Sequence, residues 1–400
     1  MNKTIMILGA SILQLPAIEK ASEMGLRVIV CDMNPDAIGF NVPGVVKEVV
    51  STIDTEGILE AARKNHIDGI MTLATDMPMQ SVAVVAKELG LVGINEDTAL
   101  KATNKAYMRD ALKEAGVPIP LYYRVHTKKA FLEDVKKIVD NGCRVIVKPA
   151  DNSGSKGIVL LDDYSPKSLA TAYEYSKKNS RAGILLIEEF MEGPEVSVET
   201  IAINGDIHII QITDKLTTGA PFFVEMGHNQ PSMLSKETKK KIAEIAIAAN
   251  KAIGIENGPS HTEIKVTKNG PKIVELGARL GGDNITTHLV PLSTGVNMVE
   301  ACIKIALGEK PDIEQKWDKG SAIRYFEQHA GIVKNIVGVE EAKQIPGIVQ
   351  VSVVHNVGEK ISEINNSGSR MGFVIAQRDT PEEAVKACEE ALEKISVEEE

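Results

Sequence analysis

Short apolar segments of strand length alternate with amphipathic helical segments in the first part of the chain. Residues 4–8 and 27–31 are apolar runs, and a helical period joins them over about residues 15–24. The same unit recurs, with an apolar run at 69–73 and a helical period at 80–89. This order predicts an α/β domain built on a parallel sheet.

The first turn of this domain raises the question of a dinucleotide site. Gly9 ends the first strand, and Asp32 follows the second strand about 20 residues later, as in dinucleotide-binding folds. Gly9 lacks the remaining glycines of the G-x-G-x-x-G motif. The pattern therefore favours the fold more than the cofactor. A dinucleotide-dependent oxidoreductase, which would bind nicotinamide, stays as an alternative.

The rest of the chain repeats this alternation in longer elements. Helical periods predict helices at residues 105–114, 128–141, 166–178, 235–253, 297–307 and 380–395. Apolar runs predict a strand that ends near Lys148, and further strands at 158–161, 183–188, 195–203 and 208–213. Residues 214–234 show no regular period, and the acidic end at 398–400 is predicted to be disordered. A chain of 400 residues is expected to form two or three domains.

A predicted β-hairpin at residues 262–279 carries the strongest chemical signal. Apolar and polar residues alternate on both arms, and Asn269-Gly270 between them is typical of a turn. Each arm carries one carboxylate, Glu263 or Glu275, and Arg279 follows. Two such carboxylates repel each other unless a cation lies between them, and an oxygen pair suits Mg²⁺. An arginine nearby suits a phosphoryl group or an acyl phosphate.

The hairpin must meet one geometric condition. Because side chains alternate with period two, Glu263 and Glu275 share a face only if the numbers of paired residues sum to an even value. A two-residue Asn269-Gly270 loop would pair 268 with 271 and separate the carboxylates, and it would need an N–H that Pro271 lacks. We therefore predict a longer or bulged turn. The alternative is an ordinary hairpin with two solvated glutamates.

Composition narrows the class of protein. Lys and Arg total 45 and Asp and Glu total 55, and the net charge of −10 argues against nucleic acid or an anionic membrane as a partner of the whole surface. The four cysteines are far apart and form no C-x-x-C, so we expect small core residues in a reducing compartment. The sequence shows neither a signal peptide nor a long apolar run, so we expect a cytoplasmic enzyme.

A polar glycine loop follows the strand that ends near Lys148. Ser153, Gly154, Ser155 and Gly157 offer backbone N–H groups and hydroxyls of the kind that hold phosphate oxygens. The loop is not a Walker A motif. The alternatives are a lysine that extends to solvent and a flexible surface loop.

A connector with two glutamates joins the next two predicted strands. Backbone groups in Glu188-Glu189-Phe190-Met191 could meet an adenine edge, and Glu195 could reach ribose hydroxyls. A surface turn would have the same appearance.

Taken together, these pieces resemble the ATP-grasp superfamily in order, spacing and chemistry over about residues 100–310. The resemblance rests on Asn104-Lys105, Lys148 in V-K-P, the Ser/Gly loop, E-E-F-M-E-G-P-E at 188–195, Glu263, Glu275 and Arg279. Within the superfamily the chain is most similar to the L-amino-acid ligase branch of the carboxylate–amine ligases, through residues 221–228, 258–263 and 367–373. Phosphoribosylglycinamide synthetase and phosphoribosylaminoimidazole carboxylase ATPase-type enzymes share the ATP half and are also similar in the opening I-L-G-A-S-I-L-Q-L-P.

This resemblance implies a fold of class α/β and α+β. A pre-ATP-grasp Rossmann-like domain would span residues 1–103, and an ATP-grasp domain 104–312 with a lid subdomain at about 115–190. A small α+β closing domain with the acidic tail would span 313–400. The implied activity is ATP-dependent ligation of a carboxylate, such as that of an amino acid, to an amine or thiol through an acyl phosphate. A purine-biosynthesis ligase and a non-catalytic ATP-binding protein are the alternatives.

The resemblance also implies roles for individual residues. Lys105, Lys148 and the Ser/Gly loop would hold the ATP phosphates. Glu188, Glu189, Phe190 and Met191 would surround adenine, and Glu195 would bind ribose. Mg²⁺, for which Mn²⁺ can substitute, would be bound by Glu263 and Glu275. Arg279 would stabilise phosphoryl transfer and contact the substrate.

The acceptor end is implied less fully. Glu225 would bind a substrate ammonium group and His228 a carboxylate, or both would be surface residues. Many relatives have asparagine two residues after the second metal glutamate; here it is Gly277, so a single metal ion is the safer expectation and Asn284 or water would replace the missing ligand. The implied partners are small carboxylates and amines and a second copy in a homodimer, without nucleic acid or membrane. His261 is expected to support other groups, with a catalytic role as the alternative, and the role of Arg370 is left open.

Overall fold

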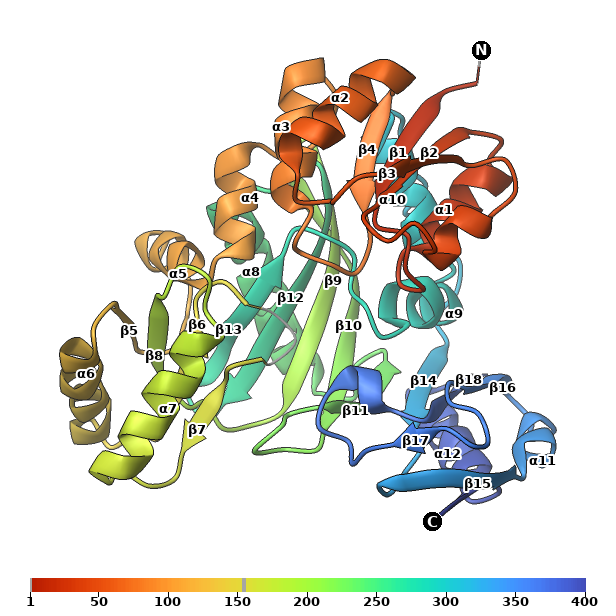
Figure 1. The fold of residues 1–400 in the computed structure, drawn as a ribbon. Coiled ribbons are helices and arrows are strands. Elements are labelled where there is room, and N and C mark those ends of the chain that lie inside the picture. Colours follow the sequence, from red (N-terminus) through yellow and green to blue (C-terminus); the bar gives the residue numbers. More distant parts are fainter. Residues whose placement is uncertain (1, 153–155) are drawn as a thin grey trace.

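The computed structural model describes residues 2–152 and 156–400. Its strands form sheets of four, eight, three and four members. In Figure 1 the N-terminal part lies at the top, the part from β5 to β8 at the left and the C-terminal part at the lower right, around the long central sheet. This arrangement brings segments from all parts of the chain towards one face of the central sheet.

The N-terminal part contains the predicted parallel sheet. Its elements are β1 (Thr4–Leu8), α1 (Leu15–Glu23), β2 (Arg27–Asp32), β3 (Val46–Val49), α2 (Thr55–Asn65), β4 (Gly69–Thr72) and α3 (Met79–Leu89). The order is β3-β2-β1-β4, and all neighbours are parallel. The loops after β1 and β4 leave the same edge of the sheet, as the carboxyl ends of parallel strands must. They bring Leu13 and Asp76 to the cavity described below.

Two helices and a small antiparallel sheet follow. Helices α4 (Glu96–Thr103) and α5 (Lys105–Glu114) meet at Asn104, whose side chain accepts a hydrogen bond from the Ala106 N–H and so starts α5 at Lys105. The sheet has the order β5-β8-β6-β7. Its elements are β5 (Tyr122–Val125), α6 (Lys128–Asp140), β6 (Val145–Pro149), β7 (Val159–Leu161), α7 (Pro166–Lys178) and β8 (Leu185–Glu189).

The eight-stranded sheet has the order β13-β12-β9-β10-β11-β14-β18-β16. Its first part comprises β9 (Glu195–Ile203), β10 (Asp206–Thr217), β11 (Glu225–Gln230), β12 (Gly258–Thr267) and β13 (Gly270–Gly277), with α8 (Lys236–Ile253) packed against β10 and β13. A π-helical turn (Ile285–Leu289), α9 (Val290–Thr294) and α10 (Met298–Ala306) follow β13. Helix α10 packs on α1 and β4, so it also contributes to the N-terminal core.

The C-terminal part extends the same sheet. It comprises β14 (Gly320–Tyr325), β15 (Gly331–Val337), α11 (Val339–Lys343), β16 (Ile348–Val353), β17 (Lys360–Ile361), β18 (Gly372–Arg378), α12 (Pro381–Leu392) and β19 (Ser396–Glu399). Strand β14 pairs with β11, so the C-terminal part is joined to the central sheet by backbone hydrogen bonds. Helix α12 packs on β14 and β18, and β17-β15-β19 form the remaining sheet.

The predictions of irregular structure at residues 214–234 and of disorder at 398–400 were wrong. The segment 214–234 contains the end of β10 and all of β11, and its charged Lys215 and Glu225 face a cavity, so no apolar period marks these strands. The acidic end is not disordered: β19 pairs with β15, and Val397 packs against the C-terminal core. A strand pattern with one apolar side was therefore overlooked.

The hairpin of β12 and β13 confirms the shared face and corrects the turn. Glu263 pairs directly with Glu275, which places both side chains on one face. The turn is a two-residue one, centred on Lys268-Asn269 rather than Asn269-Gly270. A β-bulge restores the register further along, where Val274 is the extra residue. Pro271 lies opposite Val266, whose own N–H donates to the Pro194 oxygen at 2.9 Å.

Most of the cysteines lie in the protein core. Cys31, Cys302 and Cys388 are buried as expected, while Cys143 is only half-buried, and none of the four forms a disulfide.

Within the described residues no single helix is long and apolar enough to cross a membrane. The pair Ile285–Thr294 and Met298–Ala306, bent by 113°, passes that test by length and composition when taken together.

Candidate active site

A cavity of about 890 Å³ lies between the central sheet and three surrounding parts of the chain. Most of the predicted site residues line it: Lys105, Lys148, Glu189, Phe190, Met191, Glu195, Glu225, His228, Glu263, Glu275 and Arg279. These residues are separated by up to 174 positions in the sequence (105 to 279). The structure thus brings together in one cavity residues whose proximity the sequence could only suggest.

The two hairpin carboxylates face this cavity, and each already holds a lysine. Lys105 donates from Nζ to Glu275 Oε1 at 2.7 Å, and Lys215 donates to Glu263 Oε1 at 2.8 Å. Both glutamates are partly exposed to the cavity, with side-chain exposures of 31% and 23%. Both carboxylates therefore offer accessible oxygens to the cavity rather than forming closed structural ion pairs.

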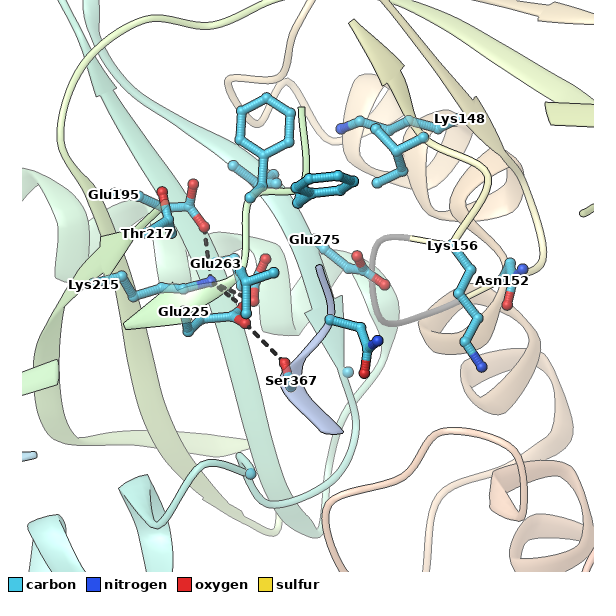
Figure 2. Close-up of a pocket in the computed structure, with 18 of the residues that line it drawn as sticks. Lys148, Asn152, Lys156, Glu195, Lys215, Thr217, Glu225, Glu263, Glu275 and Ser367 are labelled. Carbon is cyan, nitrogen blue, oxygen red and sulfur yellow. Dashed lines mark hydrogen bonds and ion pairs between the residues drawn. The ribbon is translucent and has the colours of Figure 1, made fainter. Parts of the chain in front are cut away.

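Lys215 lies at the centre of a cluster of acids (Figure 2). Its Nζ lies 2.7 Å from Glu195 and 3.7 Å from Glu225, in addition to Glu263. Burial alone would lower the pKa of Lys215, but the three carboxylates raise it well above the ordinary value. Burial raises the pKa of Glu263, but Lys215 and His261 together lower it well below the ordinary value. The cluster thus joins Lys215 to three carboxylates, and the partly exposed Lys265 adds a second cation 3.1 Å from Glu195.

Glu188 does not have its predicted place against adenine. Its side chain is fully buried and does not line the cavity. Its Oε2 lies 2.9 Å from Lys148 Nζ, and its Oε1 accepts from Arg109 Nε at 2.7 Å. Burial raises the pKa of Glu188, but the two cations lower it to about 2. The ionised carboxylate holds Lys148 at the wall of the cavity, so its contacts indicate a supporting role.

An apolar slot lies beside these charges. Ile146, Phe190, Met191 and Phe223 line this part of the cavity, and the rings of Phe190 and Phe223 are 6.0 Å apart. The Phe190 N–H is already donated to the Arg144 oxygen at 2.8 Å, so it is not available to a base. A flat apolar slot next to lysines suits a nucleobase joined to phosphates.

The glycine loop was predicted to hold phosphate, and the structure limits that prediction. Ser153, Gly154 and Ser155 lie outside the described residues. Gly157 is buried, has a φ of +81° and leaves no room for a Cβ against Pro149, so packing and backbone shape explain the glycine there. Lys156, which was not predicted, lines the cavity and adds a cation on the side of Lys148.

Arg279 is anchored from the N-terminal part. Its Nε and Nη2 lie 2.9 and 3.2 Å from the two carboxylate oxygens of Asp76. Burial lowers the pKa of Arg279, but Asp76 raises it above the ordinary value. A planar guanidinium held on one edge keeps its remaining donors in a fixed direction, and this arrangement suits an anion.

The end of the cavity near the C-terminal part contains the predicted acceptor residues. Glu225 accepts from Ser367 Oγ at 3.3 Å, and His228 Nε2 lies 3.5 Å from Asp283. Arg370 binds both oxygens of Asp283, at 2.7 and 2.9 Å, and its guanidinium stacks on the Tyr325 ring. Arg370 therefore fastens the 365–370 loop to the cavity wall, which answers the question left open about its role.

His261 lines the cavity between two carboxylates. Its Nδ1 lies 2.8 Å from Glu199, and its Nε2 lies 3.5 Å from Glu263. Burial lowers the pKa of His261, but Glu199 raises it, and the net value is about 9. The imidazolium is thus held between a fully buried glutamate and one of the hairpin carboxylates.

Sequence reasoning missed four residues that line the cavity, Asp76, Lys156, Lys215 and Asp283, and also Arg109, which is buried behind its wall. Asp76 and Arg109 carry no local signal, because each acts through a partner that is distant in sequence. Asp283 is an exception: it and Asn284 both have positive φ, and they follow Gly281-Gly282 in the chain. A glycine pair followed by Asp-Asn just after Arg279 is a pattern that could have indicated a constrained turn.

The carboxylates of the hairpin fit a divalent ion that arrives with a phosphate. Within the described residues no group of three or more His, Cys, Asp or Glu is placed to hold a metal by itself. Glu263 and Glu275 are two carboxylates on one face of one cavity, with lysines nearby. Mg²⁺ commonly takes one or two carboxylates and completes its shell with phosphate oxygens and water. The residues fit that use.

Comparison with known proteins gives two family matches. Residues 142–287 match the model of the ATP-grasp domain, and residues 324–400 match the L-amino acid ligase C-terminal domain 2. Alanine–anticapsin ligase of Bacillus subtilis (strain 168) is 29% identical over 280 residues, which cover 64% of this chain and 58% of that protein. Phosphoribosylamine–glycine ligase of Methanocaldococcus jannaschii is 25% identical over 413 residues, covering 95% and 90%.

A solved structure is similar over the full length. The crystal structure of L-amino acid ligase from Bacillus licheniformis superposes with a TM-score of 0.85 and 26% identity, and the match covers 100% of this chain and 99% of that one. The chain spans less than two thirds of the alanine–anticapsin ligase but nearly all of this crystallised ligase.

Proposed function

We propose that this chain, which belongs to the ATP-grasp superfamily, is an ATP-dependent carboxylate–amine ligase that acts on an amino acid. One observation carries the proposal. Two accessible carboxylates, two buried lysines and an anchored arginine from separate parts of the chain line one cavity beside an apolar slot. That combination suits a nucleoside triphosphate with its metal and a second, anionic reactant.

The reaction proceeds in two steps. A substrate carboxylate oxygen attacks the γ-phosphorus of ATP, the bond to the β,γ-bridging oxygen breaks, and ADP and an acyl phosphate form. An amine nitrogen then attacks the acyl carbon, loses a proton to solvent or a nearby base, and expels inorganic phosphate. Lys105, Lys148 and Arg279 would stabilise the charge on the transferring phosphoryl group. Mg²⁺, or Mn²⁺ in its place, would be held by Glu263 and Glu275 and would neutralise phosphate charge.

The charges at the acceptor end favour an amino acid over a phosphorylated amine. Glu225 and Asp283 line that end, and the free edge of the Arg279 guanidinium serves the transferring phosphoryl group in the mechanism above. A 5′-phosphate at the acceptor end would have to approach these two carboxylates. An ammonium group would instead find Glu225. The non-catalytic alternative would require the loss of a metal carboxylate or of Arg279, and all are present.

A substrate screen tests this proposal. With ATP, Mg²⁺ and a pool of amino acids, phosphate release is expected to require the pool, and removal of single amino acids should identify the two reactants. Glycine with phosphoribosylamine is expected to give no release above background. Release with that pair and not with the amino acids would support the purine-type ligase instead.

Two further features belong to the proposal. A homodimer rests on the resemblance to ligases of this type, and sedimentation would test it. A cytoplasmic location is supported by the absence of disulfides among the four cysteines. Adenine in the slot formed by Phe190 and Met191, and ribose at Glu195, are parts of the same proposal that a nucleotide-bound structure would test.

A further inference from the structure

Arg109 is the largest fully buried side chain that the proposed reaction does not use. It lies on α5, is 0% exposed, and does not line the cavity. Its Nε and Nη2 bind the two oxygens of Glu188 at 2.7 and 3.3 Å, and its Nη2 also donates to the Val274 oxygen at 2.8 Å. Its Nη1 has no hydrogen-bond partner among the described residues.

Those contacts connect the two charged walls of the cavity. Glu188 is the group that holds Lys148, on β6. Val274 is the extra residue of the β-bulge that brings Glu275 to the face of Glu263. Arg109 is thus bonded on one side to the partner of a phosphate-binding lysine and on the other side to the residue next to a metal carboxylate.

Helix α5 holds the same region at a second point. Lys105 lies four residues before Arg109, so the two side chains share one face of the helix. Lys105 binds Glu275 itself, while Arg109 binds the oxygen of the preceding residue. One helix therefore fixes both the bulge and, through Glu188, the ammonium group of Lys148.

Stability alone does not explain an arginine at this position. A buried donor without a partner costs free energy, and a buried ion pair is often no more stable than packed apolar side chains. A lysine would carry the charge but would offer all its donors from a single nitrogen, whereas the planar guanidinium presents several donors in a fixed fork. Arginine therefore suits a position at which Glu188 and the Val274 oxygen must be held in a fixed relative geometry.

We propose that Arg109 is a positioning residue that sets the separation between the Lys148 ammonium group and the Glu275 carboxylate. It thereby keeps the phosphate-binding and metal-binding ends of the ATP site in register. This inference rests on the proposed function, since it assumes that Mg²⁺-ATP occupies the cavity. Arg109 touches neither reactant and acts through Glu188 and Val274.

The test uses three variants of the full-length protein. Arg109→Lys keeps the charge and removes the fork. Arg109→Met with Glu188→Met removes both buried charges together, which general experience predicts to be close to neutral for folding. Arg27→Lys is the matched control, because Arg27 also makes two arginine hydrogen bonds, to Asn65, but far from the cavity. Binding of ATP with Mg²⁺ is measured by calorimetry, folding by urea midpoint, and turnover by ADP release.

We expect the variants to change ATP affinity and the urea midpoint independently of each other. Arg109→Lys should weaken ATP binding roughly 10-fold and lower kcat about 10- to 100-fold, because small misplacements of reacting groups have effects of that size. The KM for the amine should stay within about twofold, since the acceptor end is untouched. The double variant should recover the urea midpoint without recovering ATP affinity, and Arg27→Lys should leave ATP affinity unchanged.

Two results would overturn it. Wild-type ATP affinity in Arg109→Lys would show that the fork is not needed, and recovery of both stability and ATP affinity in the double variant would show a purely structural ion pair. A wild-type protein that bound ATP but joined no substrates would overturn the proposed function alone. The affinity comparison would then still decide the role of Arg109. Failure of the wild-type protein to bind ATP would overturn both.

Discussion

Replacing Lys215 by methionine is expected to lower the free energy of unfolding by about 3–5 kcal/mol at neutral pH, the usual cost of removing one member of a buried ion pair. The side chain is only 4% exposed and lies 2.7–3.7 Å from Glu195, Glu225 and Glu263. Methionine has a similar length and no charge, so the three carboxylates would stay together without their central cation. Urea denaturation monitored by circular dichroism measures the loss.

The pH dependence makes this prediction specific. In the wild type the pKa of Glu263 is held well below its ordinary value of 4.5, so the stability it contributes is present above that value and is lost as the pH falls. Without Lys215 that pKa is lowered only by His261 and lies closer to its ordinary value. The difference in stability between wild type and variant should therefore be largest at neutral pH and shrink as the pH falls from about 4.5 towards the lowered pKa of Glu263.

A matched variant separates charge from packing. Lys215→Arg keeps the cation and should retain most of the stability, although it should still disturb the cavity. A stability loss in Lys215→Met that is equal at pH 7 and at a pH well below 4.5 would contradict this expectation, because it would mean that lost packing and not lost charge compensation is responsible.

Glu275→Gln is expected to lower carboxylate-dependent ADP release by roughly 100-fold or more, judged from the loss of a single preorganised electrostatic group in other enzymes. Glutamine keeps the size of the side chain but removes the charge that faces the cavity and binds Lys105. The amide would leave the metal with one carboxylate, Glu263, and Lys105 without its acid. Steady-state ADP release at saturating ATP and Mg²⁺ measures the effect.

Glu314→Gln is a suitable control, since Glu314 is exposed and remote from the cavity lining. It should have wild-type turnover. A wild-type rate of ADP release in Glu275→Gln would show that Glu275 does not hold the metal of the nucleotide. Partial recovery of the variant at high Mg²⁺ would agree with a weakened metal site.

The sequence predicted well whatever depended on local pattern. Helix α5 begins at Lys105 and ends at Glu114, as its helical period predicts. The shared face of Glu263 and Glu275 followed from the period of a strand, although the register correction came from a bulge at Val274 and not from the turn. A bulge depends on what the strand packs against, so local sequence does not locate it.

The parts of the site that the sequence did not predict depend on tertiary contacts. Lys215 and Glu225 lie in strands that turn charged residues inwards, so their segment lost the apolar period expected of a buried strand. Asp76 is recognisable only through Arg279, which is 203 residues away. Glu188 was assigned to the nucleotide because of its motif, but burial between Arg109 and Lys148 makes it a support for the lysine.

Trapping the acyl phosphate would show directly that the ligation passes through this intermediate. The enzyme is incubated with ATP, Mg²⁺ and the carboxylate identified in the substrate screen, with hydroxylamine in place of the natural amine, and hydroxamate and nucleotide products are counted. The account predicts equal amounts of hydroxamate and ADP, and no ADP above background without the carboxylate. Formation of AMP and pyrophosphate, or ADP release that does not need the carboxylate, would contradict it.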